Sequence, residues 1–419
     1  MPIIRTLVRT LLRRTRPVLA AHAVVLLVCA TVPAGAQGLP SEPVVFGNER
    51  VVLSGDVSLT ASCSHPEDGP LCTGDTGFFN YSDYDNSTLR MVRIGVTTSV
   101  RINRQLSALA DVRLENNTAR PYGLYLRLHP FADKDFDIQV GRVPWTFGAY
   151  SRSSYSTSNP LIGYPLAYQY LTSLRPDALP ASPDDLFRMR GRGWLSNFPI
   201  GDQTPEAGLP VADGFRWDTG VQVHGSAGWF EAAVSVTTGS MAHPLFLDDN
   251  GGKNIAGRVA LKPFAGLIVG MSASHAPYVT DAAAAAAQAS DRDFTQRVLG
   301  ADVEFSRDHY VVRFETVAST YDLPTIEPRL HATGTMLEGR YKLTPRTYVA
   351  ARADHLGFNT ITGTLRSATW EAPVTRWEVG GGYALRRNVQ LRASWQYNTR
   401  DGGRVRKLTA LAGQFLYWF

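Results

Sequence analysis

The chain has 419 residues, with 42 Lys and Arg against 37 Asp and Glu, but the basic excess lies entirely near the N-terminus. The first 36 residues hold five arginines and no acid, so the remaining 383 residues carry 37 basic and 37 acidic side chains. A chain without net charge gives no support for a nucleic-acid partner.

The first 36 residues form a predicted export leader. Five arginines in the first 16 residues are followed by the apolar run 18–32 and by Ala34, Gly35 and Ala36. This order is typical of a cleaved secretory signal peptide. The alternative is a retained membrane helix, but a run of 15 residues is shorter than the roughly 20 that a span needs. We therefore expect a mature chain that begins near Gln37.

Two cysteines remain after this leader, Cys63 and Cys72, in the stretch ASCSHPEDGPLCTG. Cysteines this close in an exported loop favour a disulfide. A metal site is the weaker interpretation, because the stretch has no CxxC motif and His65 alone does not complete a ligand set.

Apolar and polar residues alternate with period two through the rest of the chain, as in NVQLRASWQYN at 388–398. This period predicts strands, and no long segment has the period of a helix. We expect sixteen strands, near 50–62, 88–102, 107–117, 121–129, 135–143, 214–224, 229–239, 253–262, 266–275, 295–306, 309–319, 333–343, 347–356, 374–385, 389–399 and 406–419.

The connections between these strands mostly alternate between long and short. The exception is the link near 118–120, which should be long and is short. A soluble β-sandwich also fits period two, but it has no reason to gather its long loops at one end. A membrane barrel does, since its periplasmic turns are short and its extracellular loops are long. The fold class we predict is therefore all-β, a closed antiparallel transmembrane barrel at 50–419, with 37–49 as a short periplasmic segment.

The chain ends on LTALAGQFLYWF, in which Phe415, Tyr417 and Phe419 share one face. This segment resembles the C-terminal strand of bacterial outer-membrane β-barrels, which ends in an aromatic residue. The resemblance implies that these three residues form the signal read by the barrel-assembly machinery. It also implies an outer-membrane location, with outer-membrane lipid around the barrel.

The size and strand number resemble those of the 16-stranded porins, which are often trimers, so a homotrimer is an expectation from analogy. The stretch DIQVGRVPWTFGAYS at 137–151 is similar to the phosphate-selective porin family over about a dozen residues. That likeness does not extend to the charges, because a phosphate channel should be dominated by Arg and Lys.

The longest predicted loop, 144–213, follows strand five. In 16-stranded porins this loop folds into the lumen, and its length here asks for a functional explanation. We expect a constriction formed by Arg188, Arg190 and Arg192 beside Asp184 and Asp185. The alternative is a loop that caps the external mouth.

Charged residues of both signs alternate into the predicted lumen. The arginines expected on the lumen wall include Arg93, Arg127, Arg313, Arg340 and Arg376. Nearly equal numbers of acids accompany them, so we expect most to pair across neighbouring strands. Selectivity should then depend on Arg188, Arg190 and Arg192, which Asp184 and Asp185 partly offset, so we expect at most a weak anion preference.

No enzymatic motif is present: the sequence has no HExxH, GxSxG or P-loop, and its histidines are scattered. We therefore expect no catalytic residues, no metal and no cofactor. The predicted function is passive diffusion of small hydrophilic solutes. The alternative is a barrel that acts through its loops as an enzyme or an adhesin.

Overall fold

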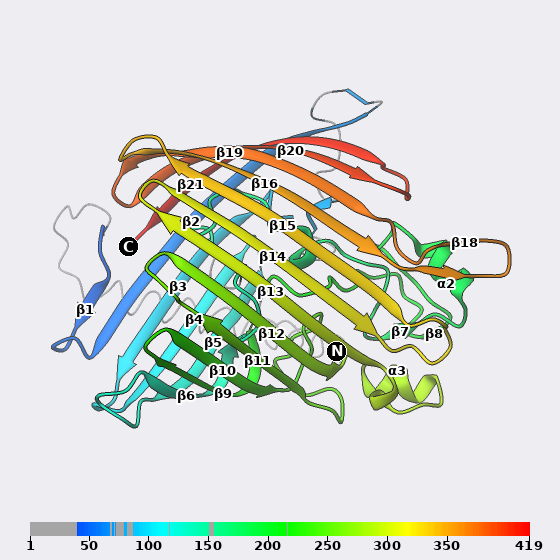
Figure 1. Ribbon diagram of the computed structural model, residues 1–419, viewed down its shortest axis with the longest axis horizontal. Coiled ribbons are helices and arrows are strands. Elements are labelled where there is room, and N and C mark those ends of the chain that lie inside the picture. Colours follow the sequence, from blue (N-terminus) through cyan, green and yellow to red (C-terminus); the bar gives the residue numbers. More distant parts are fainter. Residues whose placement is uncertain are drawn as a thin grey trace, which may run out of the picture.

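A computed structural model describes residues 40–67, 69–70, 72, 79–81, 87–116, 118–150, 155–215 and 217–419. The predicted leader 1–36 lies outside these residues. Sixteen long antiparallel strands form the wall of a barrel (Figure 1). They are β2 (Val51–Pro66), β3 (Val92–Arg101), β4 (Leu106–Glu115), β5 (Thr118–Leu128), β6 (Phe136–Pro144), β9 (Trp217–Ala227), β10 (Phe230–Thr237), β11 (Asn254–Leu261), β12 (Leu267–Pro277), β13 (Thr295–Arg307), β14 (Tyr310–Tyr321), β15 (Leu330–Lys342), β16 (Thr347–Phe358), β19 (Val374–Arg386), β20 (Val389–Arg400) and β21 (Lys407–Trp418).

The barrel closes between its first and last strands. The final strand β21 pairs with β20 on one side and with β2 on the other, so that Phe415 lies opposite both Leu391 and Leu59. Each remaining wall strand pairs with its two neighbours in chain order. Closure satisfies the backbone hydrogen bonds that an open sheet edge would leave unpaired.

The predicted fold class is confirmed, with sixteen strands and a closed antiparallel sheet. The observed first and last residues of the strands differ from the predicted ones by a few residues. β2 continues to Pro66 because β21 pairs with it along its whole last half, so Cys63 belongs to a strand and not to the loop expected there. Several short elements were not predicted, namely β1 (Val44–Phe46), β7 (Ala178–Leu179), β8 (Ile200–Gly201), β17 (Thr360–Thr362) and β18 (Ser367–Thr369).

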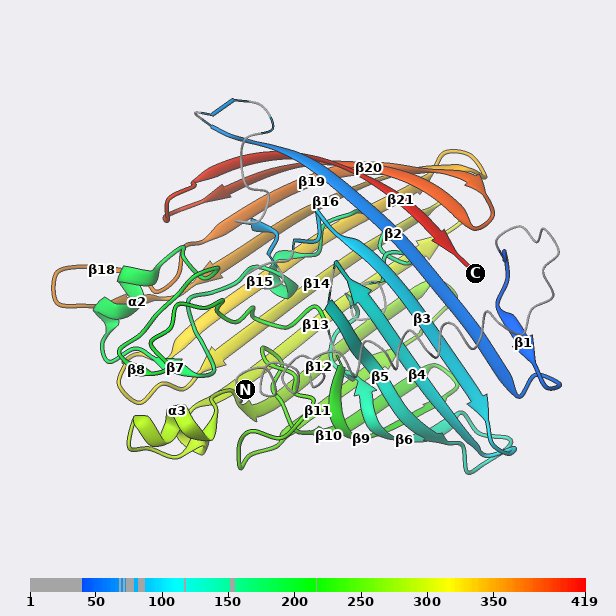
Figure 2. The same ribbon diagram turned by 180° about the vertical axis from the view of Figure 1, so that it is seen from behind.

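Connection lengths separate the two ends of the barrel. Turns such as 308–309 and 387–388 gather at one end, here called the short-turn end, and the long connections gather at the other, the long-loop end. Figures 1 and 2 show β1 and the C-terminus at the short-turn end. At the long-loop end, β4 and β5 are joined by residues 116–117 alone, as the sequence indicated.

Short helices occur only within the long connections of the described chain. They are η3 (Leu166–Tyr168), α2 (Pro183–Met189), α3 (Asp281–Ala286) and η4 (Asp291–Asp293). Among the described residues, none of these is long and apolar enough to cross a membrane.

The outer face of the wall is apolar. Leu59, Leu299, Leu337 and Trp377 are each between 45% and 64% exposed, and they alternate with inward polar residues. Aromatic side chains pair at the short-turn end, as in Phe264 with Phe305 and Phe305 with Tyr310. Such a belt flanked by aromatic residues is the surface that a barrel presents to lipid.

Candidate functional site: the lumen and its inserted loop

The connection between β6 and β9, residues 145–216, enters the barrel. Its first turn runs along the inner face of β12–β14, where the Gly148 amide donates to Ser272 Oγ at 3.0 Å and the Ala149 amide donates to Glu315 Oε1 at 2.8 Å. Tyr168 Oη donates to the same carboxylate oxygen at 2.9 Å. The beginning of the connection is therefore fixed to the wall and does not cover the outer mouth.

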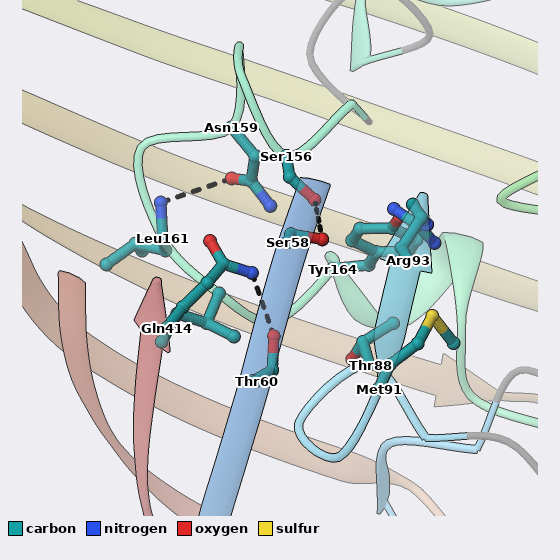
Figure 3. A pocket seen from close by; sticks show the side chains of 11 residues that line it. Ser58, Thr60, Thr88, Met91, Arg93, Ser156, Asn159, Leu161, Tyr164 and Gln414 are labelled. Atoms are coloured by element: carbon teal, nitrogen blue, oxygen red, sulfur yellow. Dashed lines mark hydrogen bonds between the residues drawn. The ribbon is translucent and has the colours of Figure 1, made fainter. Parts of the chain in front are cut away.

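Farther along, the loop reaches the opposite wall. Tyr155 Oη donates to Asp111 of β4 at 3.1 Å, and the Arg113 guanidinium lies 4.3 Å from the centre of the Tyr155 ring. Ser156 and Ser58 of β2 are joined by a hydrogen bond of 3.2 Å (Figure 3). The loop thus crosses the lumen from β12–β14 to β2 and β4.

A small polar cavity lies where the loop meets β2, β3 and β21 (Figure 3). Gln414 donates to Thr60 at 3.0 Å along its wall, and Arg93 donates to Tyr164 Oη at 2.9 Å. Its volume of about 10 Å³ has roughly the room of one water. At this place the seam between the loop and the wall has room for little more than one water.

Three buried arginines of the wall hold the next segment by its backbone carbonyls. Arg392 donates to Asn159 O at 2.7 Å, Arg352 donates to Gly163 O at 2.9 Å, and Arg376 donates to Tyr164 O at 2.8 Å. Each contact satisfies a buried carbonyl that would otherwise be desolvated at a cost. Wall arginines, which were expected to pair across neighbouring strands, therefore also anchor the inserted loop.

Apolar contacts fill the space behind these anchors. Leu166, Ala167, Tyr168 and other loop residues form one buried cluster with inward residues of β13–β21. The wall members of this cluster include Val298, Val317, Tyr321, Leu330, Ala332, Met336, Leu356, Val374 and Leu408. Polar residues were expected on this inner face, and here apolar residues replace them because protein, not water, covers them.

Glycines in the wall allow the loop to approach closely. A Cβ added to Gly334 of β15 would lie 2.6 Å from Ala167 Cβ, and one added to Gly300 of β13 would lie 2.8 Å from the Phe147 ring. Neither distance is compatible with a side chain at that position.

Three larger cavities lie on the side of the lumen that faces β2–β6 and β9–β11. The first, of about 380 Å³, lies towards the long loops beside Tyr122, Arg142, Phe215 and Trp217. The second, of about 360 Å³, is bounded by β2–β5 and includes Arg113, Tyr155 and Trp217. The third, of about 310 Å³, is bounded by β9–β11 and includes Trp145, Tyr155 and Trp217. All three share Trp217, so they adjoin one another.

The charges around these cavities are largely neutralised by one another. Arg113 bonds to Asp56 at 3.0 Å and to Asp111 at 3.1 Å, and Glu231 bonds to Lys262 at 2.7 Å. Arg258 forms a two-atom ion pair with Asp302. Paired charges give little net field in the lumen.

The five arginines predicted on the lumen wall differ in their surroundings. Arg93 pairs with Glu115, Arg127 with Asp137, and Arg313 with both Glu304 and Glu338, as cross-strand pairing predicts. Arg376 is fully buried and bonds to Asn398 and to loop carbonyls. Arg340 lies opposite Val311 and Ala350 and is exposed.

The predicted constriction residues lie near the mouth of the barrel. Figures 1 and 2 place α2 beside β18 at the long-loop end. Arg188 donates to Asn197 at 3.0 Å, and Arg190 donates to Thr369 O at 3.0 Å. Arg192 is exposed, and Asp185 caps the start of α2. The first contact lies within the connection between β6 and β9, and the second joins it to the connection between β16 and β19. The assignment of this cluster to the narrowest passage stays a prediction.

Two acids connect this part of the loop to the connection between β16 and β19. Asp184 accepts hydrogen bonds from Thr364, and these bonds lower the pKa of its carboxyl group. Glu371 accepts from the backbone amides of Ser173 and Gly191, and burial raises the pKa of its carboxyl group. The long connection therefore has an inserted first part and a second part that braces the outer loops.

The predicted disulfide between Cys63 and Cys72 is confirmed. In the terminal strand, Phe415 faces outward and Tyr417 Oη donates to Pro40 O. The role of Phe415, Tyr417 and Phe419 as an assembly signal stays a prediction. Within the described residues, no group of three or more His, Cys, Asp or Glu side chains could hold a metal ion.

A closed sixteen-stranded barrel with a loop inserted after its fifth strand has the fold of outer-membrane porins, and known structures share it. OmpT of Vibrio cholerae matches with a TM-score of 0.54 and 12% identity, over 90% of this chain and 99% of that one. An anion-selective porin from Comamonas acidovorans matches with 0.54 and 10%, over 88% and 99%. OmpF of Salmonella typhi, in complex with daunomycin, matches with 0.54 and 12%, over 88% and 97%. No family model and no curated protein matches the sequence. Identities this low show the fold alone.

Proposed function

We propose that this chain is an outer-membrane diffusion channel for small hydrophilic solutes. The observation that carries the proposal is the series of three adjoining cavities along β2–β6 and β9–β11, beside a loop that occupies the rest of the lumen. Transport through such a path is selection by size and field, with no chemical step.

The passage we propose runs past Trp217. The cavity near the long loops lies on one side of this residue, and the two cavities bounded by the wall strands lie on the other. The ring of Trp217 packs over Gly123, where an added Cβ would lie only 2.7 Å away. We take Trp217, which all three cavities share, as the narrow point of the proposed path.

The ion selectivity that we expect depends on where the charged residues lie relative to the three cavities. The expected weak anion preference depended on Arg188, Arg190 and Arg192. Arg188 bonds to Asn197 of its own connection, Arg190 bonds to Thr369 of another outer loop, and Arg192 is exposed. Charges beside the cavities are paired, so we expect a weak preference at most. The short likeness to phosphate-selective porins carries no phosphate selectivity to this chain.

Location and partners belong to the same proposal. The predicted leader 1–36 implies export, the apolar outer belt suits lipid, and the terminal aromatic residues suit recognition by the barrel-assembly machinery. One matched OmpT structure is described as a trimer form. We expect a homotrimer here also, which chemical cross-linking of membranes tests.

Planar-bilayer recording tests the function directly. Purified, folded protein should produce stepwise, ohmic conductance in potassium chloride, with a reversal potential close to zero in a salt gradient. Protein that is folded, as judged by heat-modifiable electrophoretic mobility, and yet gives no conductance steps would contradict the proposal.

A further inference from the structure

The cavity bounded by β9–β11 is lined by residues that carry buried polar atoms without protein partners. Trp145 Nε1, Gln222 Oε1 and Arg258 Nε have no hydrogen-bond partner, and all three side chains line this cavity. Their residues are only 6%, 7% and 6% exposed. A buried donor or acceptor left unsatisfied costs about 1–3 kcal/mol, so such atoms call for a polar occupant.

These unpartnered atoms, here called the orphaned atoms, include both hydrogen-bond donors and an acceptor. The indole N–H of Trp145 and the Nε–H of Arg258 can only donate, whereas the amide oxygen of Gln222 can only accept. A hydroxyl group both accepts and donates, and can therefore satisfy either kind. An occupant with several hydroxyl groups fits this set better than one that only accepts or only donates.

Net charge argues against an ionic occupant. The other nitrogens of Arg258 are held by Asp302, and Glu231 bonds to Lys262 at 2.7 Å. His224 lies between Asp137 and Glu231, with nitrogen-to-oxygen distances of 3.8 Å and 3.7 Å. Because Asp137, Asp302 and Glu231 are paired with Arg127, Arg258 and Lys262, the cavity offers hydrogen bonds without a dominant charge.

Aromatic faces complete the cavity. Trp145, Tyr155 and Trp217 line it together with the polar atoms. Broad apolar ring faces beside a few directed polar groups are the usual make-up of a small-molecule site, and the cavity's volume of about 310 Å³ is at the lower end of the roughly 300–1,000 Å³ of such sites. A cyclic polyol presents C–H faces to rings and hydroxyl groups to its edges.

We propose that this cavity is a binding station for uncharged, ring-shaped polyhydroxy solutes of monosaccharide size. This inference rests on the proposed diffusion channel and adds a solute class to it. Trp145 and Trp217 contact the faces of the solute ring, while Gln222 and Arg258 bond to its hydroxyl groups. Occupancy is transient, because the neighbouring cavities at Trp217 keep the station in contact with the rest of the path.

Single-channel recording with two matched probes tests the station. D-Glucose and D-sorbitol have nearly the same size and hydroxyl number, but only glucose is predominantly a ring in solution. Glucose should reduce the ionic current to a plateau at increasing concentration, which indicates a saturable site. Sorbitol should reduce the current only in proportion to its effect on bulk conductivity.

Two conservative variants probe the orphaned atoms. Trp145→Phe keeps a ring and removes the indole N–H, and Gln222→Leu keeps the size and removes the acceptor. Each should weaken glucose saturation about five- to tenfold, the value of one hydrogen bond. The matched control is Trp377→Phe, because Trp377 lies on the outer face and is 55% exposed.

The outcomes separate the two proposals. Absence of ionic conductance in the folded wild type contradicts the channel itself. Conductance in which glucose and sorbitol act alike shows that the cavity holds only water, and it overturns the station while leaving the channel intact. Unchanged glucose saturation in both cavity variants also overturns the station. The wild-type comparison needs no variant, so poor folding of a variant does not remove the test.

Discussion

The two sides of this barrel share the same alternating strand pattern, but their inner faces have different neighbours. Along β13–β21 the inner face carries apolar residues such as Met336 and Leu356, which pack against the inserted loop. Along β2–β6 and β9–β11 the inner face borders three cavities. Period two therefore decides which residues face inward, but the neighbour of the inner face decides whether polar or apolar residues are needed there.

The largest effect should come from removing the loop that fills one side. Replacing residues 151–212 by a short Gly-Ser linker should raise single-channel conductance severalfold, because the lumen beside β13–β21 would admit water. Removing only 181–190, which contains α2 near the mouth, is the matched control and should change conductance much less. Equal conductance in the two deletions would show that the loop does not obstruct the lumen.

A smaller effect should follow when one anchor of the loop is lost. Arg376→Ala leaves the buried carbonyl of Tyr164 without its donor and should cost about 1–3 kcal/mol of stability. Thermal unfolding, followed by heat-modifiable mobility, measures the loss. Arg340→Ala is the control, because Arg340 is an inward arginine that remains exposed. Equal midpoints for the two variants would remove the distinction between anchoring and exposed arginines.

Steric contact between loop and wall can be tested on a single strand. In β15, Gly334 faces Ala167 of the loop, whereas a Cβ on Gly339 would meet nothing within 4 Å. Gly334→Val should destabilise the protein by about 1–3 kcal/mol through overpacking, and Gly339→Val should be close to neutral. The unfolding midpoints of both variants provide the measurement, and a harmless Gly334→Val would contradict the close packing described here.

The smallest effect is expected at the outer cluster. Changing Arg188, Arg190 and Arg192 together to Glu should shift the reversal potential by only a few millivolts in 0.1 M salt or above, because exposed charges at the mouth are screened within about 10 Å. A large shift towards cation selectivity would instead place these residues in the narrow passage, as the sequence first suggested.

Sequence alone determined much of the barrel and less of its interior. All sixteen wall strands were predicted, because alternation, turn residues and the closing aromatic strand are local signals. The path of the loop depends on contacts such as that between Gly163 and Glu378, 215 residues apart, which no local pattern reveals. One signal was available in advance: Val317, Met336 and Leu356 are apolar at positions where a water-filled lumen would favour polar residues. The orphaned atoms of Trp145, Gln222 and Arg258 could be recognised only from the assembled cavity.

Cysteine accessibility tests the central claim most directly, namely that water occupies one side of the lumen and the loop occupies the other. Ala233 lines a cavity on β10, and Ala332 lies in the packed cluster on β15 with 1% exposure. Each would be changed to Cys in turn, since Cys63 and Cys72 are already joined and do not react as free thiols. A membrane-impermeant thiol reagent should react rapidly with Ala233→Cys and reduce its current, while Ala332→Cys should remain unmodified. Rapid modification of Ala332→Cys, or protection of Ala233→Cys, would contradict the account.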